Sequence, residues 1–62
     1  MKVRDVLRLL REYGWEIAHT RGSHRQLKHH ARGGRVTVAG KLSAELHPKT
    51  LRSILRQAGL VQ

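Results

Sequence analysis

The stretch "WEIAHTRGSHRQLKHHARGGRVTVA", residues 15–39, decides the fold, because apolar and polar residues alternate in it between two glycine-containing turns. Alternation with a period of two is typical of strands with one buried face. The pattern predicts strands over residues 15–20, 24–30 and 35–39, joined by the turns "RGS" and "ARGG". Connections this short predict an antiparallel meander.

The two-residue period also assigns each side chain to a face of the sheet. Trp15 and Ile17 set the inward-facing phase of the first strand, and His19 falls in the same phase. In the second strand Leu27 points inward. The opposite, polar face is predicted to carry His24, Gln26, Lys28, Arg35 and Thr37.

Amphipathic helices are predicted on both sides of this stretch. Apolar residues recur at i, i+3, i+4 and i+7 before Gly14, and again between Pro48 and Gly59. Proline is tolerated in a first helical turn, and glycine ends a helix in the left-handed conformation. Leu60 is placed to make the hydrophobic contact of a Schellman ending.

The expected order is therefore α-β-β-β-α, an α+β fold formed by one domain over residues 1–62. Each helix has one apolar stripe and each strand one apolar face, so the economical packing puts both helices on one face of the three-stranded sheet. The other face stays open. The predicted core is Val3, Val6, Leu7, Leu10, Trp15, Ile17, Leu27, Val36, Val38, Leu51, Ile54 and Leu55.

Composition excludes several classes of site. The chain has no cysteine, which excludes disulfides, zinc–thiolate sites and a thiol nucleophile, and fits a reducing cytoplasm. It has no apolar run long enough for a membrane span. We therefore expect a cytoplasmic protein without a membrane association.

The charge balance points to a polyanionic partner. Thirteen Lys or Arg residues against four Asp or Glu give a formal net charge of +9. Nucleic acid is the first candidate partner, an acidic protein the second and a membrane surface the third.

Four of the five histidines lie in "HTRGSHRQLKHH", residues 19–30. A metal site is not expected, because His29 and His30 are adjacent and point to opposite faces of a strand, and carboxylates are scarce. We expect no metal and no cofactor. A single histidine acting as general acid or base suits chemistry near neutral pH. The competing interpretation is a solvated or phosphate-binding histidine.

Three segments together resemble the HicA family of bacterial toxins: "GWEIAHTRGSHRQLKH" (14–29), "GRVTVAGK" (34–41) and "LRSILRQAGL" (51–60). The resemblance implies a fold like that of double-stranded-RNA-binding domains and an activity of cleaving mRNA independently of the ribosome. It also implies that His24, in the Gly-Ser-His motif, is catalytic, and that a HicB-type antitoxin covers the active site.

The chemistry implied is attack of the RNA 2′-hydroxyl on the adjacent phosphate, with His24 transferring a proton and cationic groups stabilising the phosphate charge. The expected RNA-binding residues are Arg21, Ser23, Arg25, Lys28 and Lys41. A second proton-transfer group is not identified, so water, Lys28 or the leaving group would have to serve.

Two other functions remain open from the sequence. One is a non-catalytic RNA-binding domain of the same fold, and the other is an inactive relative kept as a protein-interaction partner. The Gly-Ser-His turn favours the endoribonuclease, because a pure binding face has no need of a histidine at the head of the second strand.

Overall fold

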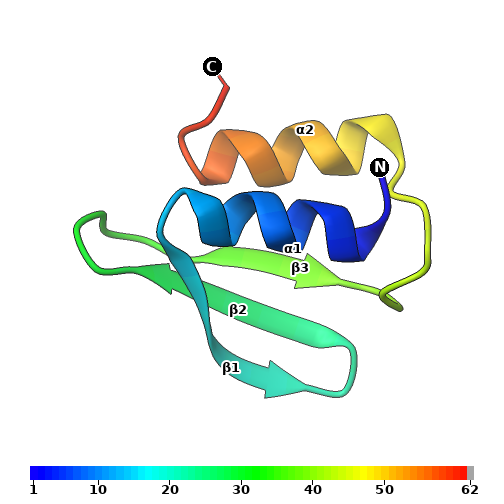
Figure 1. Cartoon of the computed structure of the whole chain (residues 1–62), viewed down its shortest axis with the longest axis horizontal. Coiled ribbons are helices and arrows are strands. Elements are labelled where there is room, and N and C mark those ends of the chain that lie inside the picture. Colours follow the sequence, from blue (N-terminus) through cyan, green and yellow to red (C-terminus); the bar gives the residue numbers. More distant parts are fainter. Residues whose placement is uncertain (62) are drawn as a thin grey trace.

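The computed structural model describes residues 1–61 and has the order α1 (Val3–Glu12), β1 (Trp15–Arg21), β2 (His24–His29), β3 (Val36–Ala39) and α2 (Pro48–Gln57). The three strands form an antiparallel sheet in the order β1-β2-β3. The two helices lie side by side next to β3, and the β1–β2 hairpin extends away from them (Figure 1). The predicted α+β fold is confirmed.

One hydrophobic cluster joins both helices to one face of the sheet. Its buried members are Val3, Val6, Leu7, Leu10, Trp15, Leu27, Val36, Val38, Ile54 and Ala58. Trp15 is the largest of the fully buried side chains. Full burial of a Val, Leu or Ile side chain stabilises a fold by about 1.5–3 kcal/mol relative to exposure, so these few residues supply most of the driving force for folding.

Three predicted core residues are less buried than expected. The prediction for Ile17 was wrong, because 43% of its surface is exposed. Ile17 is paired with Leu27, which is buried under the helices, so both point to the same side of the sheet. β1 is an edge strand, and the β1–β2 hairpin extends away from the helices (Figure 1), which leaves the Ile17 side chain partly uncovered. Leu51 and Leu55 are half-buried at the edge of the core.

A β-bulge in β1 changes the phase of the strand. Ile17 is paired with Leu27, but the next pair is His19 with Gln26, so Ala18 is an extra residue on β1. An extra residue in one strand moves every later side chain to the opposite face. The prediction that His19 points inward was therefore wrong, and His19 lies on the open face of the sheet.

The loop between β3 and α2 fixes the start of α1. The backbone N–H groups of Val3 and Arg4 donate to the carbonyl oxygens of Ala44 (2.9 Å) and Leu42 (3.0 Å). These N–H groups have no partner within the helix itself, so the loop satisfies them. The loop that follows β3 is thereby held against α1.

Both ends of α2 are capped by local hydrogen bonds. His47 precedes the helix, and its Nδ1 accepts from the backbone N–H of Lys49 at 3.1 Å. At the other end, Gly59 has a φ of 75°, and the N–H of Leu60 donates to the carbonyl of Leu55 at 2.9 Å. This is the Schellman ending that the sequence predicts.

His29 joins two segments of backbone. Its Nδ1 accepts from the N–H groups of Ala31 (3.0 Å) and Arg32 (3.2 Å), so the ring proton is on Nε2. Nε2 donates this proton to the carbonyl oxygen of Tyr13 at 2.8 Å. The ring also contacts Trp15 edge-on, with centroids 5.3 Å apart. His29 therefore connects the end of α1 to the loop after β2.

We predict that His29→Ala lowers the free energy of unfolding by about 1–3 kcal/mol, because it removes three hydrogen bonds and a contact with Trp15. The measurement is chemical denaturation. His30→Ala is the comparison: His30 is exposed and stacks on the His29 ring with centroids 4.5 Å apart, so its loss removes that contact and leaves the three hydrogen bonds of His29 in place. Equal effects of the two changes would contradict the structural role of His29.

Candidate active site

The open face of the sheet carries two rows of paired residues next to the Gly22–Ser23 turn. One row is His19, Gln26 and Thr37, and the other is Arg21, His24 and Ala39. Residues directly opposite in an antiparallel sheet point to the same face, with Cβ atoms about 4.5–5.5 Å apart. The bulge at Ala18 is what brings His19 and Arg21 into these rows.

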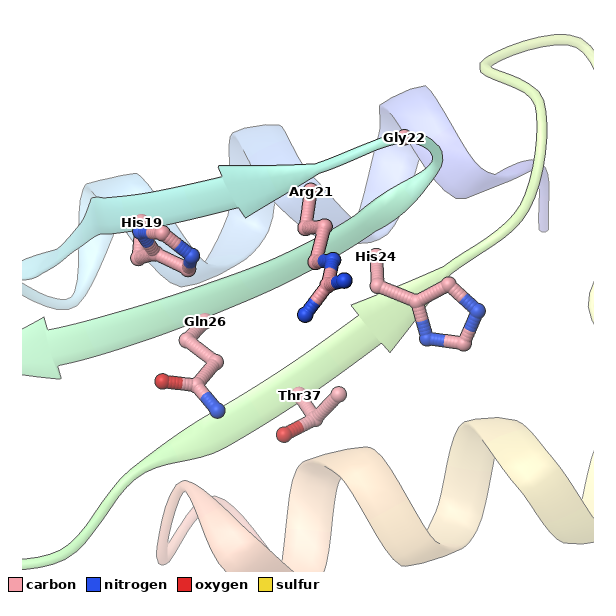
Figure 2. Close-up of a pocket in the computed structure, with 6 residues that line it drawn as sticks. All are labelled: His19, Arg21, Gly22, His24, Gln26 and Thr37. Carbon is pink, nitrogen blue, oxygen red and sulfur yellow. The ribbon is translucent and has the colours of Figure 1, made fainter.

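These rows line a depression of about 540 Å³, formed by His19, Arg21, Gly22, His24, Gln26 and Thr37. Figure 2 shows the side chains of this group on the face of the sheet away from α1. The Arg21 side chain reaches across β2, and its guanidinium ends between Gln26 and His24 (Figure 2). All six residues are exposed, so the depression is accessible to a large ligand.

The turn before His24 is held from two sides. Gly22 has a φ of 59°, a conformation that glycine adopts without steric cost. The carbonyl of Ser23 accepts from the N–H of Gly40 at 3.1 Å. Arg25 Nη1 donates to the carbonyls of both Ser23 (3.2 Å) and Gly40 (2.9 Å). The start of β2 is therefore tied to the end of β3, which fixes the backbone that carries His24.

The structure separates the predicted RNA-binding residues into three groups. Arg21 lies in the depression with His24. Arg25 is paired with Thr20 and Val38, on the opposite face, and its guanidinium is bound to backbone carbonyls.

The other three predicted RNA-binding residues lie outside the depression. Lys28 is on the open face, two residues beyond Gln26 and opposite Glu16. Ser23 is exposed in the turn before His24, and Lys41 is exposed in the loop directly after Gly40.

In residues 1–61, no three His, Asp or Glu side chains gather where they would hold a metal ion. His29 uses both ring nitrogens in hydrogen bonds to backbone, and His47 closes the start of α2. Across the same residues, neither helix is long and apolar enough to cross a membrane.

The family model for the HicA toxin of bacterial toxin-antitoxin systems matches residues 3–60. The chain belongs to the HicA toxin family. A search of the curated proteins found no match to it. Membership makes this protein the toxin of a toxin–antitoxin system and implies an antitoxin as its partner. The resemblance seen in the sequence is thus confirmed, and the matched range contains the whole depression.

The sequence alone did not identify His19 as a neighbour of His24. A strand pattern shows the phase of its side chains only while the period of two is unbroken. Ala18 is a small residue, and nothing in the sequence around it marks the position of a bulge. The structural roles of His29 and His47 were also missed. His29 binds backbone groups of a distant residue and of a loop, and histidine is not one of the residues that usually mark the N-cap of a helix.

Proposed function

We propose that this HicA toxin is an endoribonuclease that cleaves mRNA without a metal ion or cofactor, with His24 as a proton-transfer residue. The observation that carries the proposal is the position of His24 in an accessible depression, directly opposite Arg21. An imidazole beside a guanidinium offers a proton-transfer group and a phosphate ligand at one place.

The reaction begins with the 2′-hydroxyl of the RNA, which loses its proton as its oxygen attacks the adjacent phosphorus. The P–O2′ bond forms and the P–O5′ bond breaks, which leaves a 2′,3′-cyclic phosphate and a 5′-hydroxyl. Arg21 stabilises the negative charge on the non-bridging oxygens. Only RNA carries the 2′-hydroxyl, so DNA would bind without being cleaved.

Binding rests on the positive charge around the depression. Lys28 extends the open face along β2, and Lys41 lies beyond the end of β3. Ser23 adds a hydroxyl at the turn. Arg25 supports the turn from the other face and acts on RNA only through the position of His24. An mRNA substrate places the activity in the cytoplasm.

We predict that His24→Ala lowers the cleavage rate about 100- to 10,000-fold, the usual cost of losing general acid–base catalysis. The fold and RNA affinity should persist, because His24 is exposed and the affinity comes from Lys and Arg residues. The measurement is fragment production from a long single-stranded RNA in EDTA, with His30→Ala as control. Binding without cleavage by the wild-type protein would instead support the non-catalytic RNA-binding domain.

RNA affinity should fall steeply with salt, with a slope of log affinity against log salt of about −0.7 for each phosphate contact on a single strand. Lys28→Glu should weaken binding more than Arg4→Glu, because Arg4 lies on α1, behind the sheet. Both changes are made in the His24→Ala background so that the RNA stays intact. Equal losses would contradict the open face as the binding surface.

We also propose that the antitoxin is a HicB-type protein that covers the open face and excludes RNA. An acidic partner would associate rapidly with a chain of net charge +9. Chemical-shift mapping of the complex should show the largest changes at His24, Gln26 and Lys28. Changes confined to α1 and α2, with His24 unaffected, would contradict this mode of inhibition.

A further inference from the structure

We propose that His19 is the second proton-transfer group of this site and acts with His24 on opposite sides of the scissile phosphate. This inference rests on the proposed RNA cleavage and completes it. Breaking the RNA backbone moves two protons, one from the attacking 2′-hydroxyl and one to the leaving 5′-oxygen. Those oxygens lie roughly in line with the phosphorus, on opposite sides of it. One imidazole therefore cannot reach both of them in the same step.

The bulge places His19 where a second group is needed. His19 is opposite Gln26, two residues along β2 from His24, so His19 and His24 are diagonal neighbours on one face. Such diagonal positions are about 7–8 Å apart. An imidazole at each position, forming a hydrogen bond of about 2.6–3.2 Å to an oxygen, spans the attacking and leaving oxygens of one phosphodiester.

Arg21 lies between the two histidines. It is two residues from His19 on β1 and directly opposite His24. Figure 2 shows its guanidinium near the centre of the depression, with His19 on one side and His24 on the other. A phosphate bound there presents its bridging oxygens toward the two imidazoles.

Other groups fit this role less well. His29 uses both ring nitrogens in hydrogen bonds to backbone, and His30 lies beyond the end of β2. Lys28 is on the open face but does not line the depression. His19 is exposed and lines the depression with His24.

Two titrating groups with opposite roles give a bell-shaped dependence of rate on pH. Other charged groups lie on or beside this face and stay unchanged in the variants tested. On the strands and their flanking loops they are Glu16, Arg21, Lys28, Arg35 and Lys41. The helix α2 contacts β3 through a hydrogen bond of 3.5 Å from the N–H of Thr37 to Gln57 Oε1. Its cations are Lys49, Arg52 and Arg56. A limb of the profile lost in a His19 variant is therefore assigned to His19.

The test uses an oligoribonucleotide with one cleavage site mapped with the wild-type protein. A second substrate carries sulfur in place of the bridging 5′-oxygen, because a thiolate leaves without protonation. His19→Ala should lower the rate on the oxygen substrate about 100- to 10,000-fold and leave a one-sided pH profile. The sulfur substrate should restore either His19→Ala or His24→Ala, and only one of them, since a single histidine protonates the leaving group.

Two controls separate proton transfer from other roles. His19→Gln keeps a hydrogen-bonding side chain that cannot titrate, so it should be as slow as His19→Ala. His30→Ala should cleave like the wild-type protein. Thermal unfolding should be unchanged in both His19 variants, because His19 is exposed.

The inference is overturned if His19→Ala keeps the wild-type rate and bell-shaped profile, or if His19→Gln is fully active. It is also overturned if the sulfur substrate restores both histidine variants or neither. These failures leave the proposed function in place as long as the wild-type protein cleaves and His24→Ala does not. A wild-type protein that cleaves no RNA would refute the proposed function itself.

Discussion

Ala18 has no partner on β2, and this extra residue moves the later side chains of β1 to the opposite face of the sheet. Without it, the period of two would carry His19 and Arg21 to the face that packs on the helices, where the hairpin end would hold two polar side chains beside Ile17. With the bulge, both side chains join His24 and Gln26 on the open face. The depression, its guanidinium and its second histidine all depend on this change of phase.

The histidines divide into those that hold the backbone and those that face solvent. His29 binds three backbone groups and contacts the edge of Trp15, and His47 closes the start of α2. Neither is available for a ligand in these positions. His19 and His24 have exposed rings on the same face as Arg21. A dense histidine cluster in the sequence is thus resolved into structural residues and an exposed pair beside Arg21.

The basic residues likewise divide into those that hold the backbone and those that lie on the open face. Arg25 is committed to the carbonyls of Ser23 and Gly40 and keeps the turn before His24 in place. Arg21 is presented to the depression, while Lys28 extends the same face. In a protein with this net charge, the identity of a basic residue says little about its role. The strand phase decides whether its side chain lies on the open face of the sheet or supports the backbone.

The sequence by itself determined the order of elements, most of the core and the family. Periods of 3.6 and 2 residues are local properties, and the glycines at 14 and 59 marked both helix ends. Tertiary structure decided the rest. It left Ile17 uncovered, because the β1–β2 hairpin extends away from the helices, and it joined His19 to His24 through a bulge. Both outcomes depend on the pairing of β1 with β2, and pairing between strands leaves no mark in the pattern of either strand alone.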